Sequence, residues 1–139
     1  MVTLDADLQH RPEVLPPFLE ARIRTRTNII VGYRARLGTA MPVSRMLSNS
    51  ITSALVSART GVFIKDSQCG YRLLGREVLE NITIESTGYE AETEFLIKAA
   101  RKGFSIKFIP IQTVYNGERS YMTHWHTTKR FIQVLLKEY

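Results

Sequence analysis

The sequence predicts a protein of the α/β class, because short apolar runs of strand type alternate with helical patterns along its 139 residues. The predicted strands are residues 1–4, 28–34, 70–74 and 105–115. The predicted helices are residues 12–22, 42–59, 76–81, 90–102 and 125–137. No internal repeat or low-complexity linker interrupts this order, so we expect residues 1–139 to form one domain or part of one.

The first two helices are predicted from their prolines and apolar spacing. Prolines crowd the first turn of the helix at 12–22, where a missing N–H is best tolerated. The apolar stripe of this helix is Val14, Leu15, Phe18 and Leu19.

In the helix at 42–59, Pro42 opens the first turn and Gly61 supplies the stop. Its apolar face consists of Val43, Met46, Leu47, Ile51, Ala54, Leu55 and Ala58. The other face is rich in Ser and Thr. These small, weakly charged positions suggest a surface that packs against something or lies at an interface.

The later elements carry clear end signals. The helix at 90–102 has an acidic first turn, a basic last turn and Gly103 at its stop. Pro110 lies inside the strand at 105–115, which predicts an edge strand or a bulge. The last helix places Phe131, Ile132, Leu135 and Leu136 beside basic residues, so it either packs on the core or rests on an anionic membrane surface.

Composition restricts the partners and the compartment. Nineteen Lys and Arg against 13 Asp and Glu give a net charge of +6, which favours anionic partners. Cys69 is the single cysteine, so the chain forms no internal disulfide and suits a reducing compartment. The sequence has no apolar run near the roughly 20 residues of a membrane span and no signal-peptide pattern. We therefore expect a cytoplasmic protein, with peripheral contact at the cytosolic membrane face as an alternative.

A pair of carboxylates follows the first strand. Asp5 and Asp7, with Gln9 and His10, come directly after the apolar residues 1–4. Strand ends of α/β folds meet ligands at the carboxyl edge of the sheet. Oxygen ligands at this spacing suit Mg²⁺ or Mn²⁺ held against a diphosphate. The alternative is that these residues only cap the amide groups of the following helix.

This Asp-Ala-Asp-x-Gln-His segment resembles the metal site of family 2 glycosyltransferases, and it is most similar to that of polyprenyl-phosphate (dolichyl-phosphate) sugar transferases. Further matches follow in the family's order along nearly the whole chain. They are the strand end at 31–34, Ser44-Arg45-x-x-x-Asn49, the block from Asp66 to Gly70-Tyr71-Arg72, the helix containing Glu94 and the loop at 116–121. The ordered series is more specific than any one match.

The resemblance implies a role for each matching residue. Asp5, Asp7 and Gln9 would hold the metal ion. Two further residues, Arg34 and Arg45, would bind phosphate oxygens of the donor or acceptor, since guanidinium groups match phosphate geometry. In the alternative reading both are ordinary solvated arginines.

The acceptor side is implied by two further segments. Asp66 would be the catalytic carboxylate, orienting the acceptor or acting as base, or else a turn aspartate. Arg72 would bind the acceptor or serve as a structural salt-bridge partner. In the loop at 116–121, Arg119 would bind the acceptor. The loop departs from the family's pattern in two ways, because its glycine precedes the arginine and Tyr121-Met122 replaces the family's lysine region.

The implied fold is the C-terminal, acceptor-side half of the GT-A type, a mixed sheet flanked by helices. The implied activity is metal-dependent, inverting transfer of a hexose, mannose or glucose, from a GDP- or UDP-linked sugar to a polyprenyl phosphate. In the family a nucleotide-binding half precedes the metal motif. We therefore expect residues 1–139 to be a partial glycosyltransferase domain with little or no activity alone. We also expect the strand at 28–34 to have an exposed apolar edge in the lone chain, which is an aggregation hazard. In an alternative reading this edge pairs with a partner or with a second copy.

Another class of function stays open. The chain could be a non-catalytic remnant that oligomerises or binds anionic lipid or nucleic acid. Nucleic acid is disfavoured, because no binding motif and no interleaved aromatic residues accompany the basic residues.

Overall fold

The computed structural model describes residues 1–4, 12–34, 43–112 and 124–139. Its sheet has the strand order β1-β3-β2-β4. The strands are β1 (Val2–Thr3), β2 (Ile29–Arg34), β3 (Arg72–Leu74) and β4 (Ile106–Ile111). β3 is antiparallel to both β1 and β2, whereas β2 and β4 are parallel. The predicted α/β class and mixed sheet are therefore confirmed.

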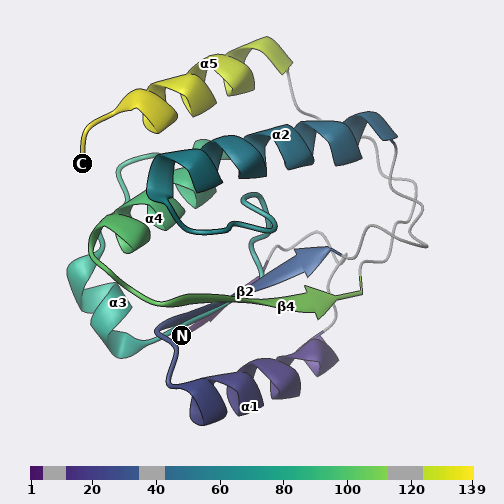
Figure 1. The fold of residues 1–139 in the computed structure, drawn as a ribbon, viewed down its shortest axis with the longest axis vertical. Coiled ribbons are helices and arrows are strands. Elements are labelled where there is room, and N and C mark those ends of the chain that lie inside the picture. The colour runs from purple at the N-terminus through teal and green to yellow at the C-terminus, as the bar shows by residue number, and fades with distance from the viewer. Residues whose placement is uncertain (5–11, 35–42, 113–123) are drawn as a thin grey trace.

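The helices cover both faces of this sheet (Figure 1). A 3₁₀ turn (Pro12–Val14) leads into α1 (Leu15–Thr25), which covers one face. On the other side lie α2 (Val43–Thr60), α4 (Glu90–Arg101) and α5 (His124–Leu136), which pack on one another. The short α3 (Arg76–Asn81) follows β3.

The apolar core lies between the two helical layers. β2 contributes three side chains with no exposed surface, Ile29, Ile30 and Val31. Phe18 of α1 is fully buried, and its ring lies 5.0 Å from that of Tyr71. Both predicted glycine stops are confirmed, because Gly61 and Gly103 follow their helices with φ of +70° and +75°, a conformation that glycine adopts without strain.

The predicted exposed edge on the strand at 28–34 is wrong. β2 is an inner strand, paired with β3 through Ile29, Ile30 and Val31 and with β4 along all six of its residues. The reason is that residues 72–74 return antiparallel to β2 and occupy the side that the sequence alone left open. Within the described residues, β4 pairs only with β2, so the edge position indicated by Pro110 is confirmed. The predicted end of this strand, residues 113–115, lies outside the described residues.

The Ser- and Thr-rich face of α2 packs against the rest of the chain, which is one of the two alternatives that the sequence left open. The buried residues of the helix are Asn49, Ser53 and Val56, which belong largely to the polar face. The apolar stripe instead faces outward: Val43, Leu47, Ile51 and Leu55 are 73%, 60%, 52% and 43% exposed. The physical reason is that the segment 61–70 passes between α2 and the sheet (Figure 1), so α2 meets backbone polar groups there.

Candidate functional site

The carboxyl ends of three strands share one edge of the sheet. β1 and β2 both run antiparallel to β3, and β4 runs parallel to β2, so all three point the same way. The first residue of β3, Arg72, lies at this edge too, opposite Thr3 and Val31. In the chain, residues 35–42 follow directly after β2, and residues 5–11 and 113–123 begin one residue beyond β1 and β4.

Two of the predicted site residues meet at this edge. Arg34, the last residue of β2, donates from Nε to Asp66 Oδ2 at 2.8 Å and from Nη2 to Asp66 Oδ1 at 3.0 Å. Asp66 is 1% exposed, and it also accepts backbone N–H groups of Arg34 and Gln68. The pair is thus a two-pronged, nearly buried ion pair with its carboxylate oxygens fully engaged.

The partners of Asp66 keep it ionised. Burial by itself raises the pKa of this carboxyl group, but the hydrogen bonds and positive charge of Arg34 and the two backbone N–H groups lower the pKa below its ordinary value. A carboxylate with a lowered pKa is a weak base. The geometry therefore suits Asp66 to holding a charge and orienting Arg34, more than to removing a proton.

Arg72 serves a neighbouring buried interaction. Its Nη2 lies 2.5 Å from Glu92 Oε2, its Nε donates to the Cys69 carbonyl, and its guanidinium lies 5.0 Å from the centre of the Phe95 ring. The residue is 3% exposed. In this structure Arg72 is the structural salt-bridge partner that the sequence left as an alternative, and it ties β3 to α4.

Glu94 forms a second buried charge cluster on α4. Its carboxylate accepts the Glu85 and Ser86 N–H groups at 3.0 and 2.8 Å, and Lys98 Nζ lies 2.6 Å away. Burial opposes ionisation, yet Lys98 and these N–H groups hold the pKa of Glu94 at about 2. Within the described residues, these contacts are with the connection between α3 and α4 and with α4 itself, so this cluster anchors that connection.

Of the remaining predicted site residues, the structure describes Arg45. Arg45 lies half-buried in the first turn of α2. The predicted metal ligands Asp5, Asp7 and Gln9 and the predicted acceptor residue Arg119 lie outside the described residues. Within the parts of the chain that are described, no three His, Cys, Asp or Glu residues gather as a metal site.

Sequence reasoning missed the role of the α2 hydroxyl groups. Ser53 and Ser57 accept the backbone N–H groups of Ser67 and Ile64, in the segment that carries Asp66. A signal was present in the spacing, because Asn49, Ser53 and Ser57 recur every four residues and so share one helix face. The apolar stripe on the opposite face obscured this signal, because such a stripe ordinarily predicts the buried face.

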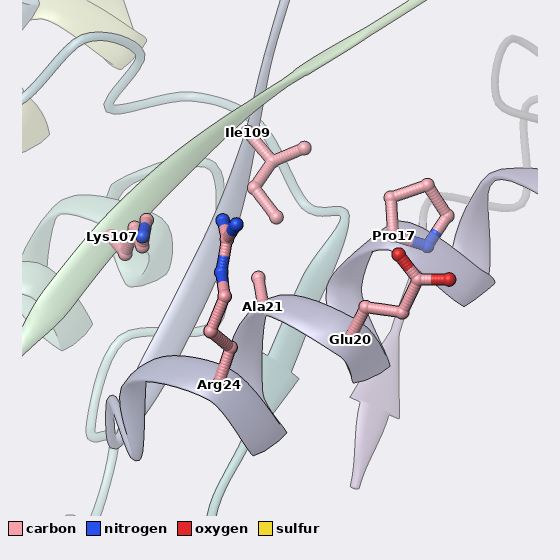
Figure 2. Close-up of a pocket in the computed structure, with 6 residues that line it drawn as sticks. All are labelled: Pro17, Glu20, Ala21, Arg24, Lys107 and Ile109. Atoms are coloured by element: carbon pink, nitrogen blue, oxygen red, sulfur yellow. The ribbon is translucent and has the colours of Figure 1, made fainter.

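A hollow lies on the face of the sheet that α1 covers (Figure 2). It measures about 310 Å³ and lies between α1 and β4. Its lining residues are Pro17, Glu20, Ala21, Arg24, Lys107 and Ile109. Among the predicted site residues that the structure describes, none lines this hollow, so it is separate from the Arg34–Asp66 pair.

Comparison with known proteins identifies several relatives. No protein-family model matches the sequence. The chain is 34% identical over 120 residues to the undecaprenyl-phosphate mannosyltransferase of Micrococcus luteus. The match covers 82% of this chain and 49% of that protein. The chain belongs to a glycosyltransferase family. The dolichyl-phosphate hexose transferase of Haloferax volcanii is 34% identical over 113 residues, covering 80% of this chain and 48% of that protein.

A third relative is named for the transfer of a different sugar. The UDP-N-acetylglucosamine–dolichyl-phosphate N-acetylglucosaminyltransferase of Methanococcus voltae is 29% identical over 119 residues, which is 82% of this chain and 47% of that protein. The chain thus spans about half the length of these curated relatives.

Among the helices that the structure describes, none combines the length and the apolar character needed to cross a bilayer.

Proposed function

We propose that this chain forms the acceptor side of a GT-A glycosyltransferase that moves a hexose from a nucleotide sugar to a polyprenyl phosphate. The observation that carries the proposal is its similarity, over about four fifths of its length, to proteins named for transfer to undecaprenyl or dolichyl phosphate. The position of the Arg34–Asp66 pair at the carboxyl edge of the sheet supports it, since α/β folds bind ligands there.

In the proposed reaction, a phosphate oxygen of the acceptor attacks the anomeric carbon of the donor sugar. The bond from that carbon to the diphosphate breaks, the nucleoside diphosphate leaves with the electron pair, and the configuration inverts. The attacking oxygen is already ionised, so the enzyme needs no strong base. Asp66, kept charged by Arg34, orients the guanidinium beside the acceptor rather than accepting a proton.

Asp5, Asp7 and Gln9 are the proposed ligands of Mg²⁺ or Mn²⁺. Two carboxylates and an amide oxygen form a donor set that these hard cations prefer. In the chain they follow β1, whose carboxyl end shares the sheet edge with that of β2, and this order supports the proposal. The ion would neutralise charge on the leaving diphosphate. Arg45 and Arg119 are proposed to contact phosphate groups of the two substrates.

We also propose that this half of the enzyme rests on the membrane that holds its lipid acceptor. The outward stripe of α2 exposes Val43, Leu47, Ile51 and Leu55 to solvent. α5, which packs against α2, adds exposed Ile132 and Leu136. A helix with an exposed apolar stripe in a protein of net charge +6 suits the headgroup region of an anionic bilayer.

The direct test is transfer by the protein expressed from its complete native gene. Labelled GDP-mannose, UDP-glucose or UDP-N-acetylglucosamine is supplied with polyprenyl phosphate and Mn²⁺. Extraction of a labelled lipid that a chelator abolishes supports the proposal. A folded protein that binds anionic vesicles without any transfer supports a non-catalytic lipid-binding module instead.

A further inference from the structure

The buried face of α2 is a row of hydroxyl groups that receive backbone N–H groups. Val62 N donates to Thr60 Oγ1 at 3.2 Å, Ile64 N to Ser57 Oγ at 2.9 Å and Ser67 N to Ser53 Oγ at 3.0 Å. The segment after α2 is therefore attached to that helix by side chains along its length.

The last of these contacts is buried. Ser53 is 3% exposed and Ser67 has no exposed surface. Ser53 Oγ lies 3.3 Å from Ser67 Oγ and 3.5 Å from Asn49 Oδ1, and Asn49 is 4% exposed. Water does not readily replace a lost partner in such a place, so the Ser67 N–H depends on Ser53.

Ser67 directly follows Asp66 in the chain. Asp66 binds Arg34 at the end of β2 with both carboxylate oxygens. The segment is thus held at two successive residues: Ser67 by α2 from one side, and Asp66 by β2 from the other. A shift of Ser67 away from Ser53 would move the Asp66 carboxylate relative to Arg34.

We propose that Ser53 is a positioning residue that holds Asp66 in register with Arg34 through the backbone of Ser67. This accounts for the inverted orientation of α2, whose polar face turns inward to meet backbone groups while its apolar stripe faces out. Ser57 extends the same attachment to Ile64. The proposal concerns the structure of the Arg34–Asp66 pair, and only its consequence for transfer rests on the proposed function.

The experiment compares Ser53→Ala with Ser50→Ala in the full chain. Ser50 lies on the same helix and donates to the Met46 carbonyl of that helix, so it is the matched control. We expect the Ser67 amide of Ser53→Ala to exchange its proton at least tenfold faster by NMR, and the pKa of Asp66 to rise toward its ordinary value. Ser50→Ala should change neither. Ser53→Cys, which keeps a similar volume but accepts weakly, should shift both in the same direction if Ser53→Ala folds poorly.

Equal exchange of Ser67 and an equal Asp66 pKa in the Ser53 variants and in Ser50→Ala would overturn the proposal. Both readouts are independent of activity, so they separate this inference from the proposed function. In a protein that transfers sugar, Ser53→Ala should lower kcat by about tenfold and leave KM for the donor within about twofold, because it displaces the site without removing a donor contact.

Discussion

Arg34 and Asp66 are 32 residues apart in the sequence, yet the guanidinium of one holds both carboxylate oxygens of the other, at 2.8 and 3.0 Å. The pair joins the end of β2 to the segment before β3. Asp66 is buried, so its charge depends on the partner. Breaking a buried pair by removing one member costs far more than losing a surface pair, because the remaining charge is left uncompensated.

Arg34→Lys is expected to lower the free energy of unfolding by about 1 to 3 kcal/mol, since lysine keeps the charge but cannot form the two parallel bonds. The pKa of Asp66 should rise, because the hydrogen bonds that lower it are reduced. Urea unfolding and NMR titration measure the two effects. Arg76→Lys is the matched control, since the Arg76–Glu80 contact spans 3.7 Å between side chains 89% and 64% exposed. An equal effect of the two substitutions would contradict the importance of the pair.

Glu94 makes a second prediction, on the pH dependence of stability. Its pKa in the folded chain is about 2, below the ordinary value of 4.5. The stabilisation is therefore complete above the ordinary pKa and is lost as the pH falls from about 5 through about 2. Its size at neutral pH is on the order of 3 kcal/mol, from about 1.4 kcal/mol for each pH unit of the shift.

Glu94→Gln should remove this stabilisation, so that its unfolding free energy differs from that of the unaltered chain at pH 7 and approaches it near pH 2. Denaturant unfolding at several pH values measures the difference. Glu80→Gln, at a largely exposed position, is the control and should stay within about 0.5 kcal/mol at pH 7. A Glu94→Gln difference that is constant from pH 7 to pH 2 would refute the role of the carboxylate charge.

Gly32 supplies a third prediction, on packing inside the sheet. A Cβ at this position would lie 2.8 Å from Ile111 Cδ1, 3.2 Å from Ile111 Cγ2 and 3.4 Å from Cys69 Sγ. Gly32→Ala is therefore expected to destabilise the fold by about 1 to 3 kcal/mol through overpacking. Ile111→Val removes the atom in closest contact. The destabilisation by Ile111→Val should therefore be smaller in the Gly32→Ala background than in the unaltered chain. Additive effects in thermal unfolding would contradict the predicted clash.

The outward face of α2 carries a fourth prediction. Leu47→Ser together with Ile51→Ser should weaken binding to vesicles of anionic lipid at least tenfold, because two exposed apolar side chains no longer enter the bilayer. Leu19→Ser with Ile23→Ser is the matched control, since this pair is also exposed and four residues apart but lies on α1, on the other face of the sheet. Vesicle co-sedimentation measures both. Equal loss in the two double variants would show that α2 has no special part in membrane contact.

The order of the elements could be predicted from sequence because each strand and helix carries its own local signals. Apolar runs, prolines at helix starts and glycines at helix stops placed α3 at the predicted residues and the others within a few residues. Such signals act over a few neighbours along the chain. They contain no information on which strand fills the side of β2 opposite β4, and the expected free edge was for that reason wrong.

The orientation of α2 could not be read from periodicity either. An amphipathic pattern predicts that the apolar face is buried when the helix lies on an apolar surface. Here the neighbouring segment presents backbone N–H groups, which Ser53 and Ser57 satisfy. The candidate site was predictable only in part. Arg34 and Asp66 were each predicted from a local motif, but their pairing is a tertiary contact that no local motif contains. The metal ligands Asp5, Asp7 and Gln9 stay a prediction.

The most direct test of the account is sugar transfer by the protein expressed from its complete native gene, with Asp66→Asn and Arg34→Lys made in the same protein. We predict Mn²⁺-dependent transfer of a hexose to polyprenyl phosphate, reduced at least a hundredfold by Asp66→Asn and clearly reduced by Arg34→Lys, with Arg76→Lys unchanged. A correctly folded protein that transfers no sugar from GDP- or UDP-linked donors, or one that Asp66→Asn leaves fully active, would contradict the account.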